Sequence, residues 1–307
     1  MRFDPVPQNV RRSVLGWSGE DGERWLASVP GTVERLLRAW ALHRTGPPFD
    51  GGTHSYALPV ERADGTPAVL KVIYRDVENQ AEPTALRAYG GDGAVMLYEY
   101  DPGTGAMLLE RAEPGAPLLE HEFPGLSERA AARERMAIAC ERYRRLWRSP
   151  VVPGEYPDFP KASDMLAAWE AGFAEPRAPL LDRIGPAWAE RALAWCSELR
   201  GPVAEGIANR DTHMGNIVSS RREPWLLIDP KPYVAERAFD GGYFVFKQVL
   251  HGPLAAAEAL RATAEALGAE LERVRAWAAL RGVDVAADLD EKDDLAAALA
   301  AVESILE

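Results

Sequence analysis

Three residues in the second half of the sequence could together carry out phosphoryl transfer. Asp211 is followed five positions later by Asn216, and Asp229 ends the apolar run 225–228. A carboxylate at the end of a buried strand is costly unless it is paired or bound to a metal ion. One carboxylate can orient a hydroxyl and accept its proton, while an amide oxygen and a second carboxylate hold Mg²⁺ on the ATP phosphates. The order D-x-x-x-x-N followed by an aspartate at a strand end is that of protein-kinase-like enzymes.

Each of these residues also has a plainer interpretation. Asp-Thr and Gly-Asn are both common in turns, and Asp211 taken alone is better explained as a turn residue. The three residues together, with a buried strand before Asp229, favour the kinase hypothesis.

Small and hydroxyl residues in the first half could contact phosphates. Gly51, Gly52, Thr53, His54 and Ser55 stand at the head of a predicted hairpin. A glycine-led turn can cover phosphates through its backbone N–H groups, although glycine with serine or threonine describes many hairpin approaches.

Lys71 interrupts the otherwise apolar strand pattern of residues 68–74. A lysine in such a strand more often faces solvent at a sheet edge. In a kinase it would pair with the α- and β-phosphates of ATP, held by a glutamate of the next helix. Glu82 is the first candidate. Glu78 is the alternative, because Pro83 directly after Glu82 is unfavourable in a helix interior.

The periodicity of the chain predicts the elements that must position these residues. Helices are expected at 21–45, 77–89, 127–148, 163–174, 186–200 and from about 243, and strands at 55–60, 68–74, 94–100 and 106–110. Asp64-Gly65 predicts a hairpin turn between the first two strands. Short apolar runs fill 203–229, and glycine- and proline-rich breaks fall at 46–52, 113–117 and 150–160. The pattern predicts an α+β fold with a strand-rich first half and a mainly helical second half.

Composition narrows the class of partner. The 307 residues include 35 Lys and Arg against 47 Asp and Glu, a formal charge of −12. A basic face for nucleic acid or for an anionic membrane surface is therefore not expected. The two cysteines suggest no disulfide framework, and we find neither a signal-peptide core nor an apolar run long enough for a membrane span. We expect a cytoplasmic protein.

The sequence resembles the aminoglycoside phosphotransferase superfamily, in particular its streptomycin 6-kinase and hydroxyurea-resistance branch. The resemblance is carried by PPFDGGTHSYALPVERADGTPAVLKV (47–72), GAVMLYEYDPGTGAMLLERAEPG (93–115), NRDTHMGNIV (209–218) and WLLIDPKPYVAERAFD (225–240). It implies a bilobal protein-kinase-like fold, with a small β-rich N-lobe at 1–112 and a larger, mainly α C-lobe at 113–307.

The same resemblance assigns roles to residues. Asp211 is implied to be the catalytic base, Asn216 and Asp229 the Mg²⁺ ligands, and Lys71 the lysine that binds the ATP phosphates. Glu110, Arg111 and Ala112 are implied to form the hinge whose backbone meets adenine. Asp240 is implied to brace the catalytic loop, and it could also be the N-cap of the following helix.

One position departs from the pattern of the superfamily. The superfamily usually reads H-G-D at the catalytic loop, and this sequence reads Asn209-Arg210-Asp211. Asparagine can donate and accept hydrogen bonds as histidine does, so we expect activity to persist. His213 is expected to be a hydrogen-bonding residue of the loop, with a role facing the substrate as the alternative.

The acceptor is expected to be a small molecule with a hydroxyl group. The first candidate is an antibiotic of the aminoglycoside kind. A peptide or nucleoside antibiotic, hydroxyurea, a housekeeping metabolite, and a pseudokinase that only binds nucleotide are the alternatives. The carboxylates that could contact a cationic acceptor are Asp158, Asp164, Glu170, Asp288, Asp290, Glu291 and Asp294. For the C-terminal run a solvated surface is the better interpretation, and Trp169 and Trp188 are expected in the core.

Overall fold

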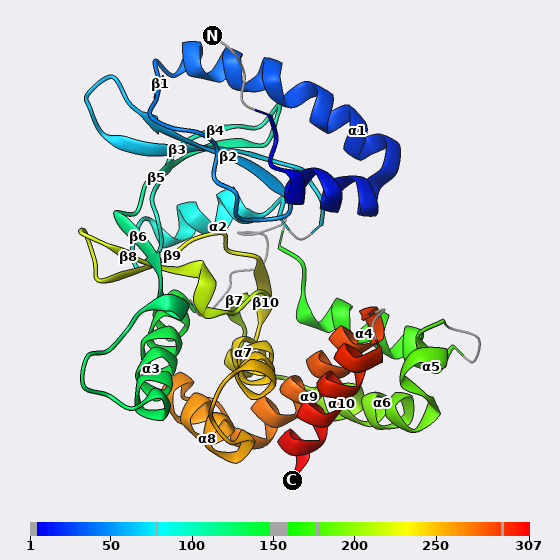
Figure 1. The fold of residues 1–307 in the computed structure, drawn as a ribbon. Coiled ribbons are helices and arrows are strands. Elements are labelled where there is room, and N and C mark those ends of the chain that lie inside the picture. Colours follow the sequence, from blue (N-terminus) through cyan, green and yellow to red (C-terminus); the bar gives the residue numbers. More distant parts are fainter. Residues whose placement is uncertain (1–4, 78, 148–158, 176–178, 290–291) are drawn as a thin grey trace. The chain divides into compact units, whose positions relative to one another are not determined.

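The computed structural model describes residues 5–77, 79–147, 159–175, 179–289 and 292–307 (Figure 1). The chain forms two compact units. The first comprises Met1–Gly115 together with Ser220–Pro224, and the second comprises Ala116–Ser219 and Trp225–Glu307. Among the residues that the structure describes, no helix is both long and apolar enough to traverse a bilayer.

The first unit is built on a five-stranded antiparallel sheet in the order β1-β2-β3-β5-β4. The strands are β1 (His43–Arg44), β2 (Ser55–Glu61), β3 (Pro67–Ile73), β4 (Leu97–Asp101) and β5 (Ala106–Glu110). The predicted β2–β3 hairpin is confirmed, with Ala57 opposite Lys71. Gly65 in its turn has φ +82°, a left-handed conformation that glycine adopts at little cost.

The glycine-rich segment leads into β2 at the head of the predicted β2–β3 hairpin, and it also takes part in a second hairpin that was not predicted. Residues 46–52 were expected only as a break, but Thr45 N–H donates to Pro59 O and Phe49 N–H to Ala57 O, at 3.1 and 2.9 Å. These bonds extend the β1–β2 pairing, so the glycines form the connection from β1 to β2. The signal was hidden because Pro47 and Pro48 break the strand pattern.

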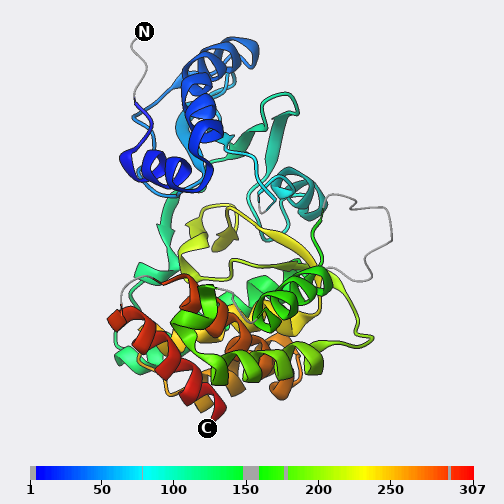
Figure 2. The same cartoon turned by 90° about the vertical axis from the view of Figure 1, so that its right-hand side faces the viewer.

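Two helices accompany this sheet. Helix α1 (Gln8–Ala39) is longer than the helix predicted at 21–45, and it is kinked at Gly19, which has φ +46°. Its buried face packs on the sheet, with Val33 and Leu36 in one core with residues of β2 and β3, and both views show this helix along the sheet (Figures 1 and 2). Helix α2 (Glu82–Tyr89) begins at Glu82, which places Pro83 in the first turn, where a proline is tolerated.

The second unit is mainly helical. Its helices are α3 (Glu128–Leu146), α4 (Ala162–Ala174), α5 (Pro179–Ile184), α6 (Pro186–Leu199), α7 (Arg237–His251), α8 (Ala256–Leu267), α9 (Leu271–Asp288) and α10 (Lys292–Leu306). Helices α6, α7, α9 and α10 share one apolar core, and α9 and α10 appear in orange and red in Figure 2. A Cβ atom on Gly242 of α7 would lie 2.5 Å from Trp277 Cβ, so glycine there permits close contact with α9.

Short strands of the second unit carry the predicted reaction centre. Strand β7 (Gly206–Asn209) pairs antiparallel with β10 (Pro232–Ala235). Strands β6 (Pro114–Pro117), β8 (Ile217–Ser220) and β9 (Trp225–Leu227) form a three-stranded sheet with β8 in the middle. The short apolar runs predicted at 203–229 are β7, β8 and β9. All four residues of β7 are buried, and so are two residues each of β8 and β9.

Candidate active site

Asp211 lies in the loop directly after β7, which joins that strand to the short helical turn Met214–Asn216. Arg210 N–H donates to Lys231 O at 2.9 Å, which continues the pairing of β7 with β10 to the loop. The Asn216 side-chain amide donates to Asp211 Oδ2 at 3.4 Å. The two residues first singled out by their spacing are therefore in contact.

The β8–β9 hairpin brings Asp229 to Asn216. Ile217 lies opposite Leu227 in this hairpin, and one step further Ile228 N–H donates to Asn216 O at 2.8 Å. Asp229 follows with φ +50°, a left-handed conformation that a non-glycine residue rarely adopts. Strain of this kind is kept where the surrounding structure imposes it, often at functional sites.

Asn209 takes the scaffold position that is usually histidine in the superfamily. Its side-chain Oδ1 accepts from Lys231 N–H at 2.9 Å and from Asp211 N–H at 3.3 Å. The side-chain oxygen of buried Asn209 thus ties the start of the Asp211 loop to the segment after Asp229. The expectation that asparagine can serve as a scaffold is supported by these two bonds.

Asp240 of α7 is hydrogen-bonded to the same loop at two points. Its carboxylate accepts from Asn209 N–H at 2.5 Å, and its backbone O accepts from the Thr212 hydroxyl at 2.8 Å. Burial raises the pKa of Asp240 well above the ordinary value, against the Asn209 hydrogen bond. The N-cap alternative for Asp240 is wrong: α7 starts at Arg237 with Glu236 as N-cap, since the chain turns helical directly after β10.

The Asp211 carboxylate is surrounded by positive and donor groups. His213 Nε2 lies 3.5 Å and Lys231 Nζ 3.9 Å from Asp211 Oδ2. Burial opposes ionisation, but the His213 hydrogen bond and the charges of His213, Lys231 and Arg281 lower the pKa of Asp211 to about 2. The group is a carboxylate at neutral pH, and it is better suited to orienting a hydroxyl than to removing its proton early.

His213 is a hydrogen-bonding residue of the loop, as predicted. Its Nδ1 accepts from Gly215 N–H at 3.1 Å. The other ring nitrogen, Nε2, faces Asp211. The Tyr143 hydroxyl donates to the His213 carbonyl at 3.2 Å and fixes the backbone here.

Lys71 of the first unit is held by Glu82, as the sequence suggested. Lys71 Nζ donates to both carboxylate oxygens of Glu82, at 2.7 and 2.8 Å. Both side chains are buried, 8% and 0% exposed, so the pair is strongly oriented. The alternative partner, Glu78, lies outside the described residues.

The glycine segment is open to solvent. Gly51, Gly52 and Thr53 are exposed, and Ser55 is the first residue of β2. The Thr53 hydroxyl lies 2.8 Å from His54 Nδ1. The structure therefore presents these residues as an accessible loop between two strands, as a phosphate-covering segment requires.

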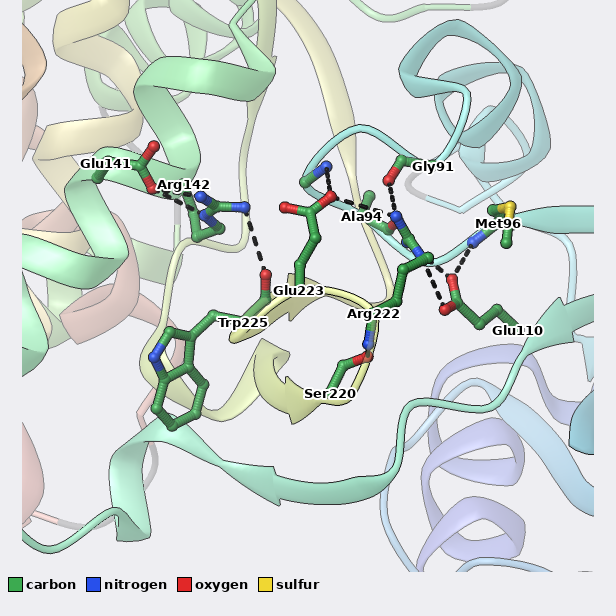
Figure 3. A network of polar contacts seen from close by, with 11 residues as sticks. Gly91, Ala94, Met96, Glu110, Glu141, Arg142, Ser220, Arg222, Glu223 and Trp225 are labelled. Atoms are coloured by element: carbon green, nitrogen blue, oxygen red, sulfur yellow. Dashed lines mark hydrogen bonds and ion pairs between the residues drawn. The ribbon is translucent and has the colours of Figure 1, made fainter.

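Glu110, implied to belong to the hinge, is bound by a residue that the sequence did not reveal. Arg222 Nε and Nη2 donate to the two Glu110 carboxylate oxygens, each at 2.8 Å (Figure 3). The same guanidinium donates to Gly91 O at 2.6 Å and Ala94 O at 2.9 Å. This arrangement fixes the end of β5, next to Ala112, through a residue more than a hundred positions away.

A second arginine supports the hairpin that carries Asp229. Arg142 of α3 donates from Nη1 to Trp225 O at 3.3 Å, at the start of β9, and its other nitrogens bind Glu141 (Figure 3). Arg142 is buried, so its loss would leave the Trp225 carbonyl without this donor.

Four of the carboxylates considered for the acceptor lie in the described part of the chain. Asp164, Asp288 and Asp294 are exposed, and Glu170 forms an ion pair with Arg200. Asp158, Asp290 and Glu291 lie outside the described residues. Trp169 and Trp188 pack against the helical core, as predicted.

Comparison with known proteins identifies the family of this chain. Residues 39–293 match the family model of the aminoglycoside/hydroxyurea antibiotic resistance kinases. The chain belongs to this family. It is an enzyme, a phosphotransferase, and the resemblance found in its sequence is confirmed.

Two relatives are similar to this chain in sequence, and one solved structure is similar to it in fold. The chain is 34% identical over 278 residues to hydroxyurea phosphotransferase of Kitasatospora aureofaciens, covering 89% of this chain and 76% of that protein. It is 33% identical over 248 residues to streptomycin 6-kinase of Streptomyces griseus, covering 76% and 72%. The structure of Plasmodium vivax ethanolamine kinase superposes with a TM-score of 0.60 at 12% identity, over 85% of this chain and 82% of that one. The predicted α+β, protein-kinase-like fold is confirmed.

Proposed function

We propose that this kinase uses ATP and Mg²⁺ to phosphorylate a hydroxyl of an antibiotic and thereby confers resistance, with an aminoglycoside of the streptomycin kind as the first candidate. The observation that carries the proposal is the contact of Asp211 with Asn216, beside Asp229 across the β8–β9 hairpin. The streptomycin 6-kinase of Streptomyces griseus supports the acceptor class.

In the proposed reaction the acceptor hydroxyl oxygen forms a bond to the γ-phosphorus as the bond to the β,γ-bridging oxygen breaks, giving a phosphate ester and ADP. Asp211 accepts a hydrogen bond from the hydroxyl and takes its proton late in the transfer. Its pKa of about 2 fits this role, because a weak base orients a nucleophile without removing its proton beforehand. Asn209 and Asp240 keep the carboxylate in place.

The donor set around Asp211 fits a magnesium ion. Asn216 and Asp229 offer an amide oxygen and a carboxylate, the hard oxygen ligands that Mg²⁺ prefers. The strained backbone of Asp229 points to the same role, since a carboxylate is retained where glycine would suit the chain better. When bound, the ion would neutralise charge on the phosphates.

Lys71 supplies positive charge for the α- and β-phosphates in this proposal. Its bidentate ion pair with Glu82 fixes the direction of the ammonium group, so that no ordering is needed when nucleotide binds. The exposed residues Gly51, Gly52 and Thr53 cover the phosphates, Ser55 follows them, and the hinge at Glu110 and Ala112 meets the adenine.

Hydroxyurea is the second candidate acceptor. The chain matches hydroxyurea phosphotransferase of Kitasatospora aureofaciens over more of its length than it matches streptomycin 6-kinase. Hydroxyurea also presents a hydroxyl, so the residues around Asp211 would act on it in the same way.

The test is ATP turnover with a panel of acceptors, comprising streptomycin, other aminoglycosides, hydroxyurea, and peptide and nucleoside antibiotics. We expect ADP release with Mg²⁺ and one acceptor class, and a fall of kcat by about a hundredfold to ten-thousandfold for Asp211→Ala. Asp182→Ala is the control, because Asp182 is an exposed carboxylate of α5 to which no role is assigned.

Other outcomes separate the alternatives. Turnover with a sugar or amino alcohol and with no antibiotic would favour a housekeeping kinase. Binding of ATP without turnover of any acceptor, equal in wild type and Asp211→Ala, would favour a pseudokinase. Expression in a sensitive host should raise resistance to the acceptor that is phosphorylated in vitro.

A further inference from the structure

The first turn of α1 is attached to the glycine loop by one side chain. The Asn9 side-chain amide nitrogen donates to Asp50 O at 2.6 Å and to Gly52 O at 2.7 Å. Both hydrogens of a single NH₂ group are therefore used on two carbonyls that stand two residues apart. Asn9 lies outside residues 39–293, the part matched to the family.

These two bonds determine the direction of two backbone N–H groups. In a trans peptide unit the C=O and the N–H that follows it point in opposite directions within one plane. The Asp50 carbonyl shares its unit with the N–H of Gly51, and the Gly52 carbonyl with that of Thr53. With both carbonyls turned toward Asn9, both N–H groups are directed away from α1. The two N–H groups, two residues apart, can therefore point to the same side of the loop, and backbone N–H groups that converge in a turn can bind an anion.

The two N–H groups are available for a ligand. Within the described part of the chain, neither Gly51 N–H nor Thr53 N–H donates a hydrogen bond to a protein acceptor. Gly51, Gly52 and Thr53 are also exposed, so a phosphate could approach them.

The segment that carries Asn9 is itself fixed in place. Val10 and Val14 of the same helical turns are fully buried. The kink at Gly19 folds this segment against the rest of α1, where a Cβ on Gly22 would lie 2.7 Å from Val14 O.

A second contact joins the same segment to the loop. The Trp17 ring stacks on the His54 ring, with centroids 4.3 Å apart and planes at 22°. Asn9 and Trp17 therefore hold the loop from the same helical segment, on either side of Thr53.

We propose that Asn9 is a positioning residue for nucleotide binding, which turns the N–H groups of Gly51 and Thr53 toward the phosphates of ATP. The inference rests on the proposed function and deepens it. Asn9 acts through the loop and does not itself touch the nucleotide. Its contribution should therefore depend on the presence of phosphates in the ligand.

The decisive variant is Asn9→Asp, which keeps the shape and replaces the NH₂ donor with a carboxylate oxygen facing two carbonyls. The matched control is Gln8→Glu, the same amide-to-carboxylate change on the neighbouring exposed residue. The dissociation constants of MgATP and of adenosine are measured for full-length proteins by calorimetry, with thermal unfolding in parallel.

We expect Asn9→Asp to weaken MgATP binding about tenfold, the effect of losing one or two well-oriented hydrogen bonds, with adenosine binding and Tm close to those of Gln8→Glu. Asn9→Gln, which keeps the donor, should recover part of the affinity. Should Asn9→Asp fail to fold, Asn9→Ala replaces it in the same measurements.

Two results would overturn the inference. One is MgATP affinity equal in Asn9→Asp and Gln8→Glu, and the other is an equal loss for adenosine and MgATP, which would mean general damage to the first unit. A wild-type protein that binds no MgATP would instead overturn the proposed function.

Discussion

The loop that carries Asp211 and the loop that carries Gly51 and Gly52 are held in contrasting ways. The first is tied by buried groups, since Asn209, Thr212 and Asp240 are each less than 4% exposed. The Asp240 carboxyl group accepts from Asn209 N–H, the Asn209 side chain accepts from Asp211 N–H, and the Thr212 hydroxyl donates to Asp240 O. The second is exposed and is held by one side chain of α1 and one ring stack.

The difference fits the roles proposed for the two loops. A group that orients a reacting hydroxyl must stay within a fraction of an ångström of its place, which requires supporting groups that cannot move. A loop that covers phosphates must admit and release the nucleotide, so it cannot be buried. Substitutions in the first loop should therefore alter kcat and stability, and those in the second should alter nucleotide affinity.

Among substitutions that test this difference between the two loops, Asp240→Ala should have the largest effect on stability and kcat. The change leaves the buried Asn209 N–H without an acceptor, which should cost about 1–3 kcal/mol of unfolding free energy, and it frees the catalytic loop. Urea unfolding and kcat measured together test it. Lower kcat at unchanged stability would mean that Asp240 acts on the chemistry and not as a brace.

Asp240→Asn is the control, because it keeps an oxygen acceptor and removes the charge. Because the pKa of Asp240 is raised in the folded protein, this carboxyl group ionises at a lower pH in the unfolded chain than in the folded protein. The contribution of Asp240 to the free energy of unfolding is therefore full below about pH 4 and is lost as pH rises through the folded pKa. The wild type should show this loss from about pH 4 upward and Asp240→Asn should lack it.

A smaller effect is expected at Asn209. Asn209→Ala removes the oxygen that accepts from Asp211 and Lys231, and should lower kcat about tenfold through misplacement of the carboxylate. Asn209→His should give an intermediate kcat, since an imidazole nitrogen accepts one hydrogen bond where the amide oxygen accepts two. A kcat for Asn209→Ala equal to that of wild type would show that the loop holds its shape without this residue.

The smallest effect is expected in the glycine loop. Gly52 has φ +85°, so Gly52→Ala should disfavour the observed loop by about 1 kcal/mol and weaken MgATP binding about fivefold, with Tm hardly changed. Gly51→Ala is the matched control, since its φ is not in the left-handed region and a Cβ there meets nothing within 4 Å. Equal affinities for the two variants would contradict a role for this backbone conformation.

Local patterns in the sequence predicted much of the fold and the site. Lys71 and its strand followed from apolar alternation and the Asp64-Gly65 turn, and the pairing with Glu82 followed from the position of the next helix. The contact between Asp211 and Asn216 followed from their spacing. In each case the partners lie close in sequence, where periodicity and turn residues carry the information.

What the sequence did not reveal depends on distant contacts. Arg222 sits in the run Arg221-Arg222-Glu223, which reads as a solvated turn, and only the fold brings it to Glu110. The first turns of α1 were missed because Pro7, Gly16 and Gly19 interrupt the helical pattern. For the same reason nothing in the sequence pointed to Asn9.

At position 229 the backbone conformation favours glycine, while the proposed metal site requires a carboxylate. The φ of +50° at Asp229 is one that glycine adopts freely, so replacing the aspartate with glycine should relieve the backbone while removing a proposed metal ligand. A stability screen of this enzyme that ignores turnover would therefore favour glycine at position 229. Engineering for heat tolerance would have to hold residue 229 fixed and seek its gains elsewhere.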